Sequence, residues 1–255
     1  MASTPTVTFD GTNINTFGAY LNADVEGWLD APSQDYATAS FVGAIGGVVS
    51  RYPTTAPRRL RLPIRVIATA IATRETYEQS LKAYLTKDVV VKLDDGTTAR
   101  EITGRCVAIP LVPYKVPVTL VSDGSVVFVC SDPLWRATSS TTETINGTPN
   151  TCALGNAPVS DWVLTITATT NSITDITITL GPNTLTWTGT IAAGQALVID
   201  ASAYTVKNNG VDALSTYGSG GFPAINPNDT PAVSATKASG SGTLGGSLVY
   251  KKRYW

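Results

Sequence analysis

The sequence of 255 residues contains no histidine, so it lacks the side chain that most often acts as a general base and often binds metal ions. Catalysis by a Ser-His-Asp triad, a Cys-His pair or an HExxH zinc site is therefore excluded. Neither a G-x-S-x-G motif nor a G-x-x-x-x-G-K-[ST] phosphate loop occurs. These absences favour a protein that is not an enzyme and has no catalytic residue, metal or cofactor.

Cysteines and long apolar runs are also scarce. Cys106, Cys130 and Cys152 are odd in number, lie more than twenty residues apart and form no C-x-x-C pair, which predicts buried free thiols. The longest nearly apolar run, Phe41 to Val49, is too short to cross a bilayer, so we expect no membrane insertion. The N-terminus has no basic stretch leading into an apolar one, so no secretory signal is expected.

Charge is sparse and balanced. Only 15% of the residues are charged and the net charge is −1, so no overall field attracts nucleic acid or an anionic membrane. Residues 1–135 carry 25 of the 37 charged side chains, and residues 136–255 carry the other 12. This shift follows the strand-interrupting segment Ser131–Trp135 and predicts a domain boundary there, between domains 1–135 and 136–255.

Short runs of Val, Ile and Thr with period-two alternation dominate the sequence and predict an all-β protein. One short helix is expected near residues 74–87, because Tyr77, Leu81, Tyr84 and Leu85 share one face at helical spacing. Thr73 is the expected N-cap of this helix.

Two Asp-Gly pairs predict hairpin turns in the first half, because Asp-Gly accepts the positive φ angles of a tight turn. One hairpin is expected around Asp95-Gly96, between strands 89–93 and 97–105. The other is expected around Asp123-Gly124, between strands 116–121 and 125–130.

The second half alternates apolar and polar residues in several closely spaced strands without a helix, which is typical of a β-sandwich. Leu248–Tyr254 is expected to be its closing strand. Trp162, Trp187 and Tyr204 could stack on a sugar ring, but their positions in the alternation predict that they belong to the core.

An arginine-rich strand is predicted from Arg58 to Ile67. Alternation places its aliphatic residues on one side and Arg59, Arg61 and Arg65 on the other. This row is either the solvated side of a half-buried strand or a surface that pairs with carboxylates of a neighbouring subunit. Pro63 lacks an N–H, so the strand should lie at a sheet edge or carry a bulge. The candidate subunit interface consists of the basic residues Arg51, Arg58, Arg59, Arg61 and Arg65 and of the acidic residues Asp24, Glu26, Asp30 and Asp35.

The succession of these elements resembles the distal tail proteins of long-tailed, non-contractile bacteriophages, which form the hub at the tip of the tail tube. The resemblance covers nearly the whole chain. Its carriers are the strand Arg58–Ile67, the helix after it, the two hairpins, and the segments Cys130–Trp135, Asn146–Pro149, Leu197–Asp200, Phe222–Asn228 and Leu248–Trp255.

The resemblance implies a tail-tube-like N-terminal β domain that forms a six-membered ring around the DNA channel, and a galectin-like C-terminal β-sandwich that projects outward. It implies a structural protein of the virion tail tip that is assembled in the host cytoplasm. The implied partners are further copies of the chain, the tail-tube protein, the tail-tip or tail-associated lysin protein and receptor-binding components. DNA would pass through the channel without specific binding.

Two other functions are compatible with the sequence. The chain could be a tail-tube subunit of the same lineage, which would polymerise into long tubes, or a carbohydrate-binding module of the tail tip. A binding site of the galectin type for galactose is not expected, because it relies on a histidine.

Overall fold

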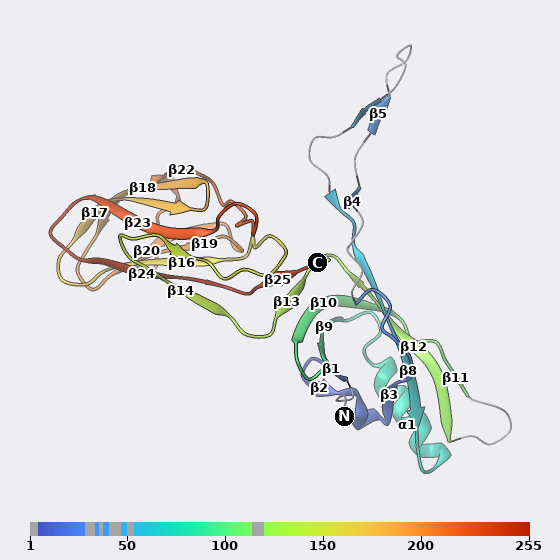
Figure 1. Cartoon of the computed structure of the whole chain (residues 1–255). Helices are drawn as coiled ribbons and strands as arrows, with labels where there is room; N and C mark the ends of the chain where they lie inside the picture. Colours follow the sequence, from blue (N-terminus) through green and yellow to red (C-terminus); the bar gives the residue numbers. More distant parts are fainter. Residues whose placement is uncertain (1–4, 29–33, 36–37, 41–46, 50–53, 114–119) are drawn as a thin grey trace. The chain divides into compact units, whose positions relative to one another are not determined.

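The computed structural model describes residues 5–28, 34–35, 38–40, 47–49, 54–113 and 120–255 (Figure 1). The chain divides into two compact units, one of residues 1–135 with Trp255 and one of residues 136–254. Both units are built of β-strands, and the described residues contain a single α-helix, so the predicted all-β fold with one helix is confirmed. No helix in these ranges is long and apolar enough to span a membrane.

The main sheet of the first unit is antiparallel and follows the order β2-β1-β9-β10-β12-β8-β3, with β11 also paired to β12. Its strands are β1 (Thr6–Phe9), β2 (Thr12–Asn13), β3 (Ala19–Leu21), β8 (Arg58–Ile67), β9 (Asp88–Asp94), β10 (Ala99–Ala108), β11 (Leu111–Pro113) and β12 (Val121–Cys130), with β13 (Trp135–Ala137) at the unit boundary and the 3-10 helix η1 (Ile14–Phe17) between β2 and β3. Two small ladders pair β4 (Gln34–Asp35) with β7 (Thr54–Thr55) and β5 (Thr38–Ser40) with β6 (Gly47–Val49).

The core of this unit lies on one side of the sheet. In β8, every second residue from Leu60 to Val66 is buried, as the alternation predicts. Phe9 packs edge to face on Phe128 at 5.3 Å and on Tyr84 at 5.4 Å between ring centroids. Because each large apolar side chain contributes about 1.5–3 kcal/mol when fully buried, this aromatic cluster stabilises the inner side of the sheet.

The helix, α1 (Ile71–Lys82), begins and ends earlier than the sequence predicts. Thr73 lies inside it, and the N-cap Ala70 makes no side-chain cap hydrogen bond, so the expected cap is wrong. The helix ends at Lys82 because the next residues form turns with i to i−3 hydrogen bonds, and Thr86 then takes a positive φ and donates its N–H to Cys106 O of β10. This tertiary hydrogen bond directs the chain into β9.

One of the two predicted hairpins is confirmed and the other is wrong. Strands β9 and β10 pair around Asp95-Gly96, with Asp94 opposite Ala99. Asp123-Gly124, in contrast, lies inside the continuous strand β12, which pairs with β8 along its whole length. Tertiary pairing therefore overrides the local turn preference of this dipeptide.

The second unit is a sandwich of two antiparallel sheets, in the orders β14-β24-β16-β19-β20-β21 and β15-β23-β17-β18-β22. The strands of the two sheets are β14 (Thr141–Ile145), β15 (Asn150–Thr151), β16 (Val163–Ala168), β17 (Ile173–Leu180), β18 (Asn183–Ile191), β19 (Ala196–Asp200), β20 (Thr205–Asn208), β21 (Val211–Asp212), β22 (Tyr217–Ser219), β23 (Ala232–Ser239) and β24 (Leu244–Tyr250), with the 3-10 helix η2 (Leu214–Thr216) before β22. The last strand, β25 (Arg253–Tyr254), lies outside both sheets and pairs with β13. The predicted closing strand corresponds to β24 and β25, with Lys251 and Lys252 between them.

Apolar residues of both sheets form one continuous core between them. Trp162 and Trp187 are buried there as predicted, and the Trp162 indole N–H donates to Pro223 O at 2.8 Å. Tyr204 is 67% exposed, so its predicted place in the core is wrong. Its φ of 54° places it in the turn before β20, where strand alternation does not apply.

Candidate subunit interface on the first unit

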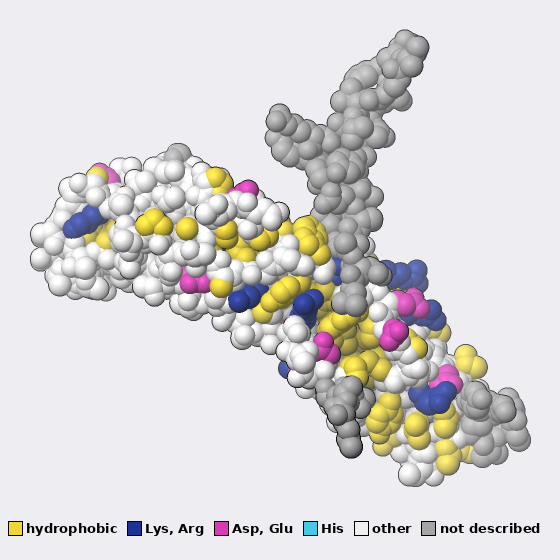
Figure 2. Space-filling view, in the orientation of Figure 1, with side chains coloured by type: hydrophobic (Ala, Val, Ile, Leu, Met, Phe, Trp, Pro, Cys, Tyr) yellow, Lys and Arg dark blue, Asp and Glu magenta, His cyan; other side chains and the backbone are white. Residues whose placement is uncertain are grey.

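Three arginines of β8 point to the outer side of the sheet, opposite the core. Arg59, Arg61 and Arg65 are exposed, while the aliphatic residues between them are buried. We call these three residues the arginine surface. Charged side chains gather on the first unit and are few on the sandwich in the view of Figure 2, as the sequence count of charges leads one to expect.

Two members of the arginine surface form ion pairs within the chain. Arg61 Nη1 lies 3.0 Å from Glu26 Oε1, and its Nε donates to Ser125 Oγ at 3.2 Å. Arg65 donates from Nε and Nη2 to both carboxylate oxygens of Asp123, at 2.7 and 3.0 Å. These hydrogen bonds lower the pKa of Asp123 below its usual value. Both pairs are partly solvated, so each contributes about 0–1 kcal/mol to stability.

Arg59 belongs to a row of directly opposed, exposed residues across four strands. The row runs from Asp88 on β9 through Arg105 on β10 and Val129 on β12 to Arg59. Arg105 donates to both oxygens of Asp88 at 2.9 and 3.0 Å, which lowers the pKa of this carboxyl. Val107, which is 47% exposed, adds a further apolar side chain beside this row, so the surface combines charge with exposed valine.

Other residues of the candidate interface, basic and acidic, either differ from the prediction or have side chains that the structure does not describe. Arg58 points to the core side, is 4% exposed and lies over the Trp135 ring at 6.0 Å, so its guanidinium is not accessible on the outer surface. Arg51 and Asp30 lie outside the described residues. For Asp35, only the backbone is described, and it pairs with Thr54.

The segment 22–26, which contains Asp24 and Glu26, runs alongside β8 and bulges away from it near Pro63. Asn22 N donates to Pro63 O, and Glu26 then forms a two-way backbone bridge with Arg61. Four residue steps on the segment therefore oppose two on β8, and the intervening residues protrude. The sequence predicts a bulge or an edge at Pro63. In the structure β8 lies between β12 and β3 and pairs with β12 without a bulge, so the prediction is wrong for β8 itself; the extra residues lie on the segment that faces Pro63.

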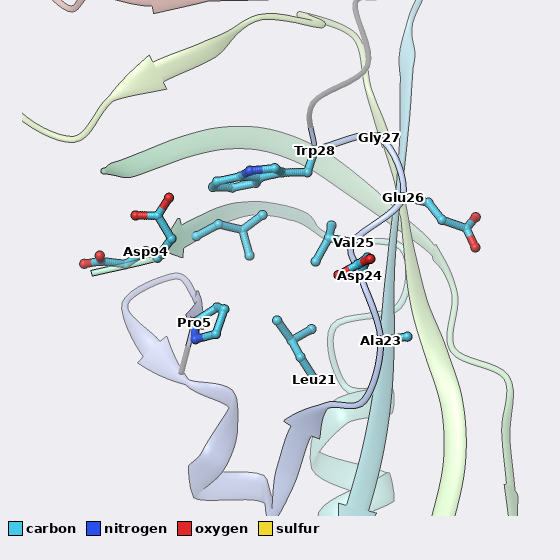
Figure 3. A pocket seen from close by; sticks show the side chains of 11 residues that line it. Pro5, Leu21, Ala23, Asp24, Val25, Glu26, Gly27, Trp28 and Asp94 are labelled. Atoms are coloured by element: carbon cyan, nitrogen blue, oxygen red, sulfur yellow. The ribbon is translucent and has the colours of Figure 1, made fainter. Parts of the chain in front are cut away.

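The bulge borders a cavity of about 700 Å³ (Figure 3). Its apolar wall includes Leu21, Val25, Leu93 and the indole of Trp28, which packs edge to face on Trp135 at 4.8 Å. Glu26 points away from this cavity, toward the arginine surface. Besides Glu26, the charged residues that line the cavity are Asp24, Asp94 and Asp95, with no lysine or arginine among the described lining residues.

Asp24 and Arg59 differ from Glu26, Arg61 and Arg65, which form ion pairs within the chain. Among the residues that the structure describes, Asp24 is exposed and has no ion-pair partner, and the same is true of Arg59. Neither of these two charges is therefore neutralised by an ion pair with a described residue of the same chain.

Metal binding and thiol reactivity depend on how Cys, Asp and Glu side chains are arranged and buried. No group of three or more Cys, Asp or Glu side chains in the described ranges is arranged to hold a metal ion. All three cysteines are buried and free, as predicted, and burial raises the pKa of each thiol to about 11. The thiols are therefore protonated at neutral pH and are poor nucleophiles.

The sequence did not reveal the partners of the arginine surface. The sequence predicts a turn at Asp123 and contains no signal that marks Ser125 as a partner of Arg61. Their positions depend on the register between strands that are distant in sequence, such as Asp123 opposite Arg65, and no local pattern encodes that register.

No family model matches the sequence, and the search of curated proteins finds no match. Among solved structures, the phage SPP1 Dit protein (gp 19.1), described as a paradigm of the hub adsorption apparatus in phages that infect Gram-positive bacteria, matches with a TM-score of 0.77 at 14% identity. The match covers 99% of this chain and 100% of the Dit chain. A chain of the phage P2 baseplate in its activated conformation gives a TM-score of 0.48 at 7% identity, covering 100% and 99% of the two chains. The predicted resemblance to distal tail proteins is thereby confirmed for the fold, which is similar to that of SPP1 Dit along the entire chain.

Proposed function

We propose that this chain is a structural hub protein of a bacteriophage tail tip, which forms a closed ring between the tail tube and the tail-tip or lysin and receptor-binding components. The observation that carries the proposal is the similarity to SPP1 Dit over both units. A tube subunit would need only the first unit, whereas the match extends through the sandwich.

Two surfaces of the first unit support head-to-tail contacts between copies. Arg59 with its neighbouring valines is basic and partly apolar, and the cavity beside Asp24 is acidic and partly apolar. Two different surfaces that complement each other form a heterologous contact, and such contacts close into a ring when the rotation between copies permits. Arg61 and Arg65 already have partners within the chain, so Arg59 is the arginine available for this contact.

The charge balance agrees with a DNA channel. Each phosphate contact made by Lys or Arg adds affinity for DNA, and a channel that DNA must traverse should not hold it. A chain with a net charge of −1 and few charged residues meets this requirement. The channel itself would be lined by the first unit, as the sequence resemblance implies.

Negative-stain electron microscopy of the purified protein tests this proposal. We expect closed rings with a central opening, single or as two stacked rings, even at high concentration. Long tubes would instead identify a tail-tube subunit, and isolated small particles at every concentration would contradict both assignments.

A further inference from the structure

Tyr204 combines exposure with an unfavourable backbone conformation. The residue is 67% exposed and has a φ of 54°, a left-handed conformation that bulky residues rarely adopt. Asn or Gly would occupy this position with less strain, and burial of the ring provides little compensation. Strained residues of this kind concentrate at binding sites, so this exposed ring is a candidate for function.

Hydrogen bonds to the Asp200 carboxylate fix the turn that precedes Tyr204. The carboxylate of Asp200 accepts hydrogen bonds from the backbone N–H groups of Ser202 and Ala203, at 2.9 and 3.0 Å, and from Ser202 Oγ at 2.6 Å. These bonds, chiefly that from the Ser202 hydroxyl, lower the pKa of Asp200, so the carboxylate is ionised at neutral pH. The turn is thus fixed before any ligand arrives.

Two further rings support Tyr204. Phe222 packs edge to face against it, with ring centroids 5.4 Å apart and planes at 86°, and Tyr217 packs on Phe222 at 5.5 Å. The Tyr217 hydroxyl donates to Gly221 O, which ties the loop that carries Phe222. The three rings form a preorganised platform, and preorganisation lowers the entropic cost of binding.

Exposed residues with hydroxyl groups occur close to Tyr204 in the sequence, and the second unit as a whole carries few charges. Ser202 is exposed two residues before Tyr204, and Ser215 and Thr216 are exposed on η2, which contacts β20. The unit as a whole carries 12 charged residues in 120, too few for a nucleic acid or an anionic lipid. Serine and threonine hydroxyls both donate and accept hydrogen bonds, as sugar hydroxyls do.

We propose that Tyr204, supported by Phe222, is a stacking platform for the pyranose ring of a neutral carbohydrate. The sugar's C–H groups would contact the aromatic ring, and Ser202 Oγ, which donates its own hydrogen to Asp200, could accept a hydrogen bond from a sugar hydroxyl. An amphipathic aromatic side chain suits a ligand that has an apolar face and a polar rim. The proposal rests on the second unit alone, so it does not depend on ring formation.

The test uses the full chain on an array of neutral oligosaccharides built from glucose, galactose and N-acetylhexosamine units, followed by saturation-transfer NMR with the oligosaccharides that bind. Tyr204→Phe keeps the ring and should retain the same glycans. Tyr204→Asn removes the ring, suits the left-handed backbone and should bind at least about ten-fold more weakly. Val211→Ala is the matched control, because Val211 is 69% exposed on the same unit, and it should bind like the wild type.

Thermal unfolding establishes that Tyr204→Asn is folded before binding is compared. Failure of the wild-type chain to bind any neutral glycan at millimolar concentration overturns the proposal. Equal binding by wild type and Tyr204→Asn also overturns it. If the chain binds no glycan but binds a protein in a manner that depends on Tyr204, the carbohydrate proposal is overturned and the Tyr204 side chain belongs to a protein-binding surface.

Discussion

At the residue scale, Gly124 shows why an Asp-Gly pair can lie within a strand. A Cβ at this position would be 1.9 Å from Pro110 O, so the close approach of the chain before β11 requires glycine. The glycine therefore serves packing between neighbouring segments, although its sequence context suggests a turn. Sequence reasoning detects the glycine but cannot tell these two roles apart, because the contact with Pro110 arises only after the strands have paired.

Substitution of Gly124 tests this explanation. We expect Gly124→Ala to destabilise the protein by about 1–3 kcal/mol, because the backbone of Pro110 cannot move aside as a flexible side chain could. Gly147→Ala is the control, since a Cβ at Gly147 meets nothing within 4 Å. Denaturant unfolding measures both variants, and equal stability of the two would contradict the packing role of Gly124.

The lowered pKa of Asp95 predicts that part of the stability of the fold is lost in acid. Hydrogen bonds, first from the Thr97 hydroxyl and then from the backbone N–H groups of Thr98 and Thr97, lower its pKa from 3.8 to about 2. The folded state therefore favours the carboxylate, so this stabilisation is present above about pH 4 and is lost as the pH falls toward 2. The melting temperature should fall less between pH 5 and pH 2 in Asp95→Asn than in wild type, and parallel curves would show that this turn does not contribute.

At the scale of elements, alternation predicts strands better than local signals predict their ends. The arginine strand is found where expected, with the predicted residues outward, because burial of one side imposes period two. The helix starts earlier than predicted, at a residue without a side-chain cap, and it ends earlier because Thr86 forms a tertiary hydrogen bond with Cys106 that the local sequence does not encode. The candidate interface was therefore predictable as a charged side of a strand, but its internal ion pairs were not.

The arginine surface carries the prediction about assembly. Arg59→Glu should leave the subunit folded, because Arg59 is exposed and has no ion-pair partner among the described residues, and it should shift the population from ring to monomer. Arg61→Glu also breaks the pair with Glu26, so Arg59→Glu is the cleaner variant. High salt should weaken the wild-type ring slightly, because exposed ion pairs are screened.

Exchanging the charges of Asp24 and Arg59 tests whether these two residues face each other between neighbouring copies. Adding Asp24→Arg to Arg59→Glu should restore part of the assembly if Asp24 of one copy faces Arg59 of the next. Lys207→Glu, an equal change of charge on the sandwich, is the control and should assemble like wild type. Size-exclusion chromatography at matched concentration compares the four proteins. If Arg59→Glu assembles normally, the arginine surface is simply solvated.

At the scale of the whole molecule, the two units predict separable folding. Residues 136–255 contain both sheets of the sandwich and its complete apolar core. We therefore expect this segment to fold alone with a β-type circular-dichroism spectrum and a cooperative thermal transition. A disordered spectrum for the isolated segment, with the full chain folded, would show that the sandwich needs the first unit.

The mass of the full chain in solution tests the central claim most directly. Multi-angle light scattering should give one closed oligomer, with six copies of the 26.7 kDa chain at about 160 kDa or twice that value for two stacked rings. The mass should not grow further as the concentration rises. A uniform mass of 26.7 kDa from micromolar to millimolar concentration would contradict the ring and with it the proposed role as a tail-tip hub.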